Sequence, residues 1–147
     1  MNGQKVALIV DDTQANRFFF ERLLQQAGFT IHSAATGSEA IQVLDSEDEL
    51  ALAILDIEMG DSNGLDLTKR IRATHEEACI VVATMHDERA IMDSAFSKGC
   101  DIFLVKPNGF IDLFKRLTTL VNGDLRSGTP LIIDQYGVRK YVALTEV

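Results

Sequence analysis

The chain has 147 residues, of which 46% are hydrophobic and 24% are charged, which is enough for about one globular domain with a sizeable core. Its formal net charge of -8 argues against nucleic-acid binding through this domain, because neutralising phosphates requires a basic surface. No stretch approaches the ~20 uncharged apolar residues of a membrane span, and the N-terminus has no signal-peptide pattern. We therefore expect a cytoplasmic protein with no membrane partner.

Short apolar runs alternate with helix-like segments along the chain up to about residue 122. The sequence predicts strands at 5–10, 30–34, 50–55, 79–84 and 101–105. It predicts helices at 14–27, 37–45, 65–74, 87–98 and 110–122. This alternation indicates an α/β fold, a parallel sheet covered on both faces by right-handed crossovers.

Polar side chains follow four of these predicted strands. They are Asp11 and Asp12, then Asp56, Thr84 and Lys106. Ligands of open α/β sheets bind beyond the carboxyl ends of the strands, so we expect these side chains to converge at one edge of the sheet. Three carboxylates repel one another, and one ammonium group cannot balance them. A cluster of oxygen ligands therefore predicts a Mg²⁺ or Mn²⁺ site, with Asp56 as a nucleophile or a ligand.

The two cysteines, Cys79 and Cys100, lack the spacing of a zinc site or a redox motif. We expect both to be reduced, buried thiols without a functional role.

The tail beyond residue 122 has a different pattern. The turn-rich segment "NGDLRSGTP" precedes two short apolar runs, which predict a β-hairpin at 130–144 with Gly137 in its turn. We expect a first domain at 1–122, with its core already complete, and a C-terminal extension at 123–147. An isolated hairpin is marginally stable, so it should either fold onto its own domain or pair with a partner or a second copy.

Four motifs in order carry a resemblance to the receiver domain of two-component response regulators. They are "LIVDDTQANR", "ILDIEMGDSNG", "VVAT" and "FLVKP". The resemblance covers about residues 5–122 and implies the flavodoxin-like fold of the chemotaxis regulators. It therefore implies a five-stranded parallel sheet of order 2-1-3-4-5, with the C-terminal hairpin as an addition.

The resemblance also implies roles for the residues at the strand ends. Asp56 would accept a phosphoryl group, with Thr84 and Lys106 as the catalytic residues beside it. The metal ligands would be the side chains of Asp11, Asp12 and Asp56 and the backbone carbonyl of Glu58.

Other positions would transmit or tune the signal. Thr84 and Phe103 would be the switch residues, and Glu58, Met85 and His86 would modulate the lifetime of the phosphoryl group. Met85 stands where the family has a small residue, so its side chain would crowd the pocket. Gly60 stands where proline is usual, which would loosen the loop after Asp56.

The function implied is that of a phosphorylation-dependent signalling switch rather than a turnover enzyme. The phosphoryl group would come from a histidine kinase, a phosphotransfer protein or a small phosphodonor, and the output would be contact with a downstream protein or a homodimer. One alternative is a pseudo-receiver that serves as a constitutive binding module. Another is a phosphohydrolase with Asp56 as nucleophile, although Asp56-Ile57-Glu58 lacks the second aspartate of that class.

Overall fold

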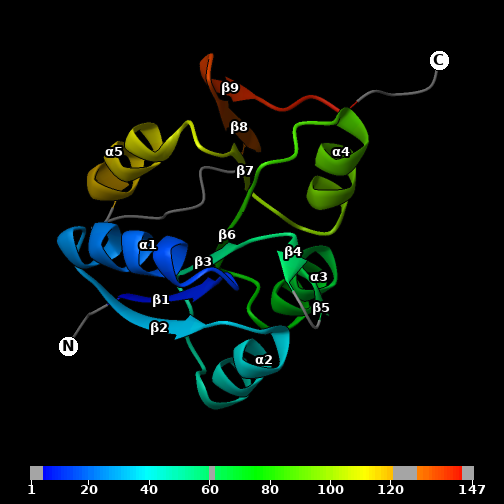
Figure 1. Cartoon of the computed structure of the whole chain (residues 1–147). Helices are drawn as coiled ribbons and strands as arrows, with labels where there is room; N and C mark the ends of the chain where they lie inside the picture. The colour runs from blue at the N-terminus through cyan, green and yellow to red at the C-terminus, as the bar shows by residue number, and fades with distance from the viewer. Residues whose placement is uncertain (1–4, 60–61, 121–128, 144–147) are drawn as a thin grey trace.

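The apolar runs of the sequence form the centre of the molecule as one twisted sheet (Figure 1). The computed structural model describes residues 5–59, 62–120 and 129–143. The strands of the main sheet are β1 (Lys5–Val10), β2 (Phe29–Ala34), β3 (Leu52–Leu55), β6 (Cys79–Thr84), β7 (Ile102–Val105), β8 (Leu131–Asp134) and β9 (Gly137–Lys140). A two-stranded ribbon, which the sequence did not predict, consists of β4 (Glu58–Met59) and β5 (Ser62–Asn63).

Helices connect the strands and cover both faces of the sheet. They are α1 (Gln14–Gln26), α2 (Gly37–Ser46), α3 (Gly64–Thr74), α4 (Arg89–Ser97) and α5 (Phe110–Leu120). Successive side chains of a strand point to opposite faces of the sheet. Ile9 of β1 therefore belongs to the core beneath α1 and α5, whereas Leu8 belongs to the core beneath α2 and α3. The described part of the chain contains no helix long and apolar enough to cross a membrane.

The order of the sheet confirms the predicted fold class. The strands lie in the order β2-β1-β3-β6-β7-β8-β9, so the first five reproduce the expected order 2-1-3-4-5, and all four pairings among them are parallel. In such a sheet the five parallel strands, β1, β2, β3, β6 and β7, all end at the same edge. The topology therefore places the polar strand ends together.

The C-terminal hairpin is present, but it is not a separate addition. Strand β8 pairs parallel with β7, and β9 pairs antiparallel with β8, so within the described residues the main sheet has seven strands instead of five. Leu131, Ile132 and Ile133 are buried in the same cores as the first five strands. The expectation that the core is complete by residue 122 is therefore wrong, because β8 supplies apolar side chains to both faces. The boundary at 122–123 itself lies outside the described residues, as do Gly60 and Leu144.

Local signals explain where two of the helices begin. Thr36 caps α2: its hydroxyl accepts a hydrogen bond from the backbone N–H of Glu39, and the Glu39 carboxylate accepts one from Ala35 N. Asn63 caps α3, its side-chain oxygen accepting a hydrogen bond from Leu65 N at 2.7 Å. This second cap ends the loop that follows Asp56, so the start of α3 limits where that loop can lie.

Candidate functional site

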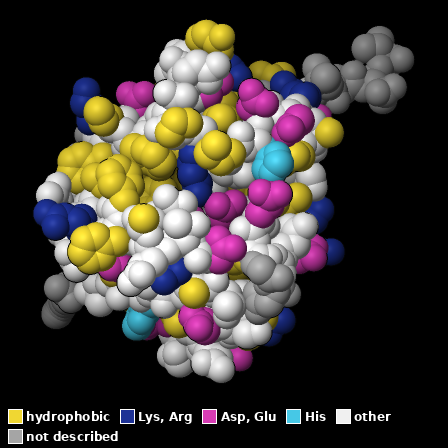
Figure 2. Space-filling view, viewed as in Figure 1, with side chains coloured by type: hydrophobic (Ala, Val, Ile, Leu, Met, Phe, Trp, Pro, Cys, Tyr) yellow, Lys and Arg dark blue, Asp and Glu magenta, His cyan; other side chains and the backbone are white. Residues whose placement is uncertain are grey.

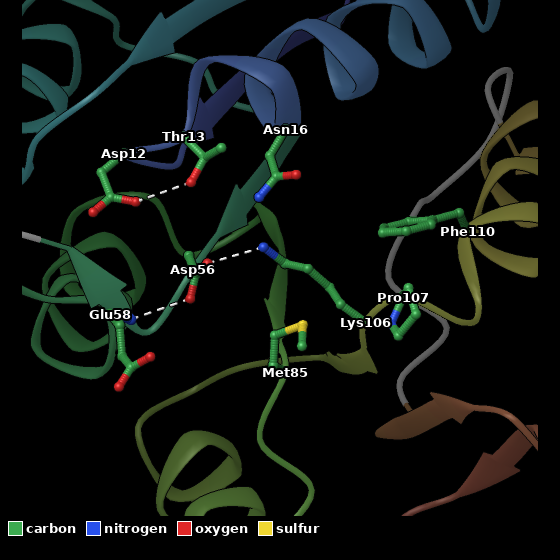
Figure 3. Close-up of a pocket in the computed structure, with 9 residues that line it drawn as sticks. All are labelled: Asp12, Thr13, Asn16, Asp56, Glu58, Met85, Lys106, Pro107 and Phe110. Carbon is green, nitrogen blue, oxygen red and sulfur yellow. Dashed lines mark hydrogen bonds and ion pairs between the residues drawn. The ribbon is translucent and has the colours of Figure 1, made fainter.

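Four side chains predicted from the sequence meet at the carboxyl edge of the sheet. Asp11 follows β1, Asp56 follows β3, Thr84 is the last residue of β6, and Lys106 follows β7. Figure 3 shows Lys106 reaching from its loop toward Asp56, with Asp12 and Glu58 on the far side. The fold therefore brings these predicted side chains together at one edge of the sheet.

Lys106 connects two of the carboxylates. Its Nζ lies 2.9 Å from Asp56 Oδ2 and 3.0 Å from Asp11 Oδ2, and the Lys106 and Asp11 side chains are only 6% and 3% exposed. Burial of the ammonium group lowers its pKa, but the hydrogen bonds and charges of Asp56 and Asp11 outweigh burial. The pKa of Lys106 is therefore raised above its ordinary value. Lys106 is held as a cation between two anions.

Asp11 is fixed by several further hydrogen bonds. Its Oδ1 accepts one from the backbone N–H of Thr13 at 2.9 Å, and Asn16 Nδ2 lies 3.3 Å from its Oδ2. Its carbonyl oxygen accepts a hydrogen bond from Arg17 Nη1 at 2.7 Å. Asp12 is exposed and makes a long contact of 3.4 Å with the Thr13 hydroxyl. The two neighbouring aspartates thus differ: one is an anchored, buried anion, and the other faces the open side of the site.

Asp56 lies in a loop whose backbone is closely packed. Its Oδ1 accepts a hydrogen bond from Glu58 N at 3.1 Å, and its side chain is 16% exposed. Gly64, at the start of α3, donates from its backbone N–H to Ile57 O at 2.8 Å. A Cβ at Gly64 would lie 2.0 Å from the carbonyl oxygen of Asp56, so glycine is required there for this close approach.

The segment after β6 contributes the other predicted residues. Thr84 is 1% exposed, and its hydroxyl lies 3.3 Å from His86 N. His86 Nε2 is 3.3 Å from Glu58 Oε2, and its Nδ1 is 3.5 Å from Glu88 Oε2. The hydrogen bond with Glu58 is the main cause that raises the pKa of His86 above its ordinary value. Burial opposes it, but the charges of Glu58 and Glu88 add to the hydrogen bond, so the net shift is upward.

Phe103 lies away from these groups. It is fully buried in a cluster with Met92 and Ala95 of α4, and its ring centroid lies 6.4 Å from that of Phe96. It belongs to the apolar core beside the site and does not line the cavity.

An open cavity of about 370 Å³ lies above the strand ends (Figure 3). Five of the predicted residues line it: Asp12, Asp56, Glu58, Met85 and Lys106. Met85 is 71% exposed, so it forms part of the rim rather than a cover. Asp11, Thr84 and His86 lie outside the lining.

Four lining residues were not among the predicted site residues: Thr13, Asn16, Pro107 and Phe110. Asn16 could have been found, because it lies in the first turn of the predicted helix that begins shortly after Asp11 and Asp12, close to the polar strand end. Phe110 carries no polar signal. Its ring packs edge-on against Phe19 at 4.9 Å and Phe20 at 5.4 Å, which places it at the wall of the cavity.

The donor atoms suit a hard divalent cation. Carboxylates of Asp11, Asp12 and Asp56 and the carbonyl of Glu58 are the oxygen ligands that Mg²⁺ and Ca²⁺ prefer. In the ranges described, no three His, Cys, Asp or Glu side chains are grouped closely enough to hold a metal on their own. This agrees with the geometry above, in which the Lys106 ammonium occupies the space between Asp11 and Asp56. The residue types fit a metal that also takes water and backbone oxygen ligands.

Comparisons with known sequences agree with this arrangement. The model of the response regulator receiver domain family matches residues 7–118. The transcriptional regulatory protein GltR of Pseudomonas aeruginosa is 34% identical over 122 residues, covering 82% of this chain and 50% of that protein. The response regulator MprA of Mycobacterium ulcerans is 32% identical over 114 residues, covering 78% of this chain and 49% of that protein. The chain thus spans about half the length of these curated relatives.

Solved structures share the fold. A two-component response regulator from Clostridium difficile is 28% identical with a TM-score of 0.74, over 81% of this chain and 97% of that chain. A response regulator from Burkholderia pseudomallei was crystallised with a phosphorylated aspartic acid, a calcium ion and citrate. It is 24% identical with a TM-score of 0.71, over 81% of this chain and 71% of that chain.

The family match spans the sheet from β1 to β7 and every one of the converging polar residues. Its members are the signalling domains of two-component systems. The chain belongs to the response regulator receiver domain family.

Proposed function

We propose that Asp56 is a phosphoacceptor and that the domain is a phosphorylation-dependent switch. The observation that carries this proposal is the setting of the Asp56 carboxylate. One oxygen lies against the Lys106 ammonium at 2.9 Å, the other against the N–H of Glu58 at 3.1 Å, and the side chain lines an open cavity. A carboxylate in that setting is both oriented and accessible to an incoming phosphorus atom.

In the proposed transfer, an oxygen of Asp56 forms a bond to phosphorus while the bond from phosphorus to the donor breaks. The donor leaves as the imidazole of a phosphohistidine or as the carboxylate of a small acyl phosphate. Negative charge then spreads over the three equatorial oxygens. Lys106 and the Glu58 N–H, which contact Asp56, would neutralise or hydrogen-bond these oxygens. The Thr84 hydroxyl, which lies outside the cavity lining, would have to turn toward the phosphoryl group to join them.

We propose Mg²⁺ as the cofactor, with Mn²⁺ as a substitute. Asp11, Asp12, Asp56 and the carbonyl of Glu58 would hold it, and it would supply positive charge beside the phosphoryl oxygens. The carboxylates exceed Lys106 in number, so the site has unbalanced negative charge for a divalent cation to neutralise. Asp12, which makes no ion pair with Lys106 and faces the cavity, would be the more direct ligand.

Glu58, Met85 and His86 would set how long the phosphoryl group survives. All three lie at the rim of the cavity or against it, where they can obstruct or orient an attacking water molecule. Slow autodephosphorylation would be the only turnover that the domain catalyses.

The phosphodonor would be a histidine kinase or a phosphotransfer protein. Figure 2 shows hydrophobic side chains gathered over α1 and α5, next to the acidic centre of the face. Phe18 is 60% exposed, Phe19 43% and Ile111 72%. Phe110 joins this surface to the cavity wall, so a protein that docks on it would reach Asp56. The downstream target would be another protein rather than nucleic acid, given the net charge of -8.

The test is covalent labelling by acetyl phosphate with Mg²⁺, followed by intact mass. We expect one phosphoryl group on the wild type, none on Asp56→Asn, and wild-type labelling on Asp48→Asn, an exposed aspartate in the segment between α2 and β3. Equal labelling of Asp56→Asn would refute the assignment. Absence of labelling in the wild type would leave the constitutive binding module as the better account.

A second experiment tests the metal independently of phosphorylation. Because a ligand that binds only the folded state stabilises it by mass action, Mg²⁺ at 100 times its Kd should add about 2.7 kcal/mol to the free energy of unfolding. Asp12→Asn should lose most of the rise in Tm, whereas Glu88→Gln should keep it. An equal rise in both variants would exclude Asp12 as a ligand.

A further inference from the structure

The residues that follow β9 pack against α4. We call residues 141–143 the C-terminal strap. The ring of Tyr141 stacks on the ring of Phe96 with centroids 4.0 Å apart and an interplanar angle of 17°, and its hydroxyl donates a hydrogen bond to Asp93 Oδ1. The backbone N–H of Tyr141 donates to Pro130 O at 2.9 Å, so the strap is also tied to the start of β8.

Arg89 adds a second attachment. Its guanidinium lies 4.8 Å from the centroid of the Tyr141 ring and donates a hydrogen bond to the carbonyl of Val142. It also pairs with Asp93 across one helical turn, Nε to Oδ1 at 2.9 Å. Arg89, Asp93 and Phe96 lie at helical spacing on one stripe of α4, so the strap holds the helix along most of its length.

This stripe of α4 leads directly to the proposed switch. The ring centroid of Phe96 is 4.0 Å from that of Tyr141 and 6.4 Å from that of Phe103. The other end of α4 continues into the segment of Thr84 and His86, where the Thr84 hydroxyl accepts from His86 N. Tyr141 itself does not line the cavity, so these neighbours offer an indirect route from a phosphoryl group on Asp56 to the strap.

We propose that the C-terminal strap is a built-in brake on the switch, an inference that rests on the proposed function. The contacts of Tyr141 and Val142 stabilise α4 in the arrangement of the unmodified chain. A rearrangement of α4 on modification of Asp56 that moves Phe96 off the Tyr141 ring, or Arg89 away from Val142, would break these contacts. Thermodynamic linkage then requires that the strap weakens phosphoryl binding by the same factor by which the phosphoryl group weakens strap docking.

Couplings of this kind between two sites are commonly about fivefold or more in affinity. We therefore expect the Tyr141→Ala variant to bind beryllofluoride with Mg²⁺, a non-covalent stand-in for the phosphoryl group, at least about fivefold more tightly than the wild type. Tyr141→Phe keeps the stacked ring and loses only the hydroxyl contact with Asp93. Its affinity for beryllofluoride should therefore lie between those of the wild type and Tyr141→Ala.

The matched control is Tyr136→Ala. Tyr136 lies in the turn of the same hairpin and is 82% exposed, so this variant removes the same side chain without touching α4. Its affinity should equal that of the wild type. Binding can be followed by ¹⁹F NMR, which detects bound beryllofluoride directly.

The outcomes separate this proposal from the one on which it rests. Wild-type binding with unchanged or weaker binding by Tyr141→Ala would refute the brake and leave Asp56 as the phosphoacceptor. An equal increase in beryllofluoride affinity in Tyr141→Ala and Tyr136→Ala would also refute the brake, because a general loosening of the hairpin would then explain the effect. Failure of the wild type and of all variants to bind would overturn both proposals.

Discussion

Truncation of Ile133 to alanine tests whether the receiver domain depends on its C-terminal hairpin. Ile133 is 0% exposed in β8 and is paired in register with Leu104 of β7. It also packs on the loop that carries Lys106: a Cβ at Gly109 would lie 2.6 Å from Ile133 Cγ2. Removing its outer atoms would leave a void between the hairpin and the loop at the cavity wall.

The expected loss in the free energy of unfolding follows from the burial of Ile133. Large-to-small substitutions of fully buried isoleucine cost about 2–5 kcal/mol, and the rigid strands on both sides of β8 limit how far the void can collapse, so we expect about 3 kcal/mol. For a chain of this size, that loss lowers Tm by about 6–12 °C. Val142→Ala is the control: Val142 is 70% exposed, and its truncation should change stability by less than about 0.5 kcal/mol.

The assay is urea denaturation followed by far-UV circular dichroism, with thermal melts in parallel. A single cooperative transition at lower urea with an unchanged m-value is the expected result for Ile133→Ala. A loss below about 1 kcal/mol, or a separate early transition for the hairpin, would contradict the argument. The domain at 1–122 would then be complete without β8.

Three further predictions concern the site. Met85→Ala should speed both phosphorylation and dephosphorylation of Asp56 by less than about tenfold, because an exposed rim residue hinders access without closing it; unchanged rates in radiolabelled phosphate assays would exclude Met85. The hydrogen bond with Glu58 raises the pKa of His86, so its contribution to stability is complete below the unfolded value of about 6.5 and is lost as pH rises through the raised value. An NMR titration should therefore give a lower His86 pKa in Glu58→Gln, and an unchanged value would contradict the pairing. Gly64→Ala should destabilise the domain by more than about 1 kcal/mol and reduce labelling of Asp56, since the new Cβ would clash with the Asp56 carbonyl; wild-type urea midpoints and labelling would refute this.

The fold could be predicted where local pattern and topology agree. The runs at 5–10 and 79–84 are strands with the expected bounds, because short continuous apolar segments are typical of the strands of a parallel sheet, which are buried on both faces. The join between β7 and β8 could not be predicted. The sequence marks the hairpin through its apolar runs and Gly137, but pairing between distant strands depends on which sheet edge is open. The ribbon of β4 and β5 has two residues in each strand, too few for a periodic signal.

The site, like the fold, has features that could be predicted from the sequence and features that could not. The convergence of Asp11, Asp56 and Lys106 could be predicted, because parallel strands end at one edge. Two features could not: the Lys106 bridge to both carboxylates, which depends on the rotamer of a long side chain, and the contact of Tyr141 with α4, which joins residues far apart in the sequence. Phe110 carries no polar signal in the sequence, and its place at the cavity wall depends on packing against α1.

The position of β8 and β9 also determines which strand ends the sheet. Without the hairpin, β7 would be the outermost strand, and its wholly buried sequence Ile-Phe-Leu-Val would offer unpaired backbone groups beside apolar side chains. With the hairpin, the outermost strand at this edge, opposite β2, is β9, a four-residue strand that carries Arg139 and Lys140 and is partly or fully exposed throughout. Short, cationic outer strands resist pairing with other chains. We therefore expect the extension to reduce association between sheets, so a chain cut before β8 should aggregate at concentrations at which the full chain stays dispersed.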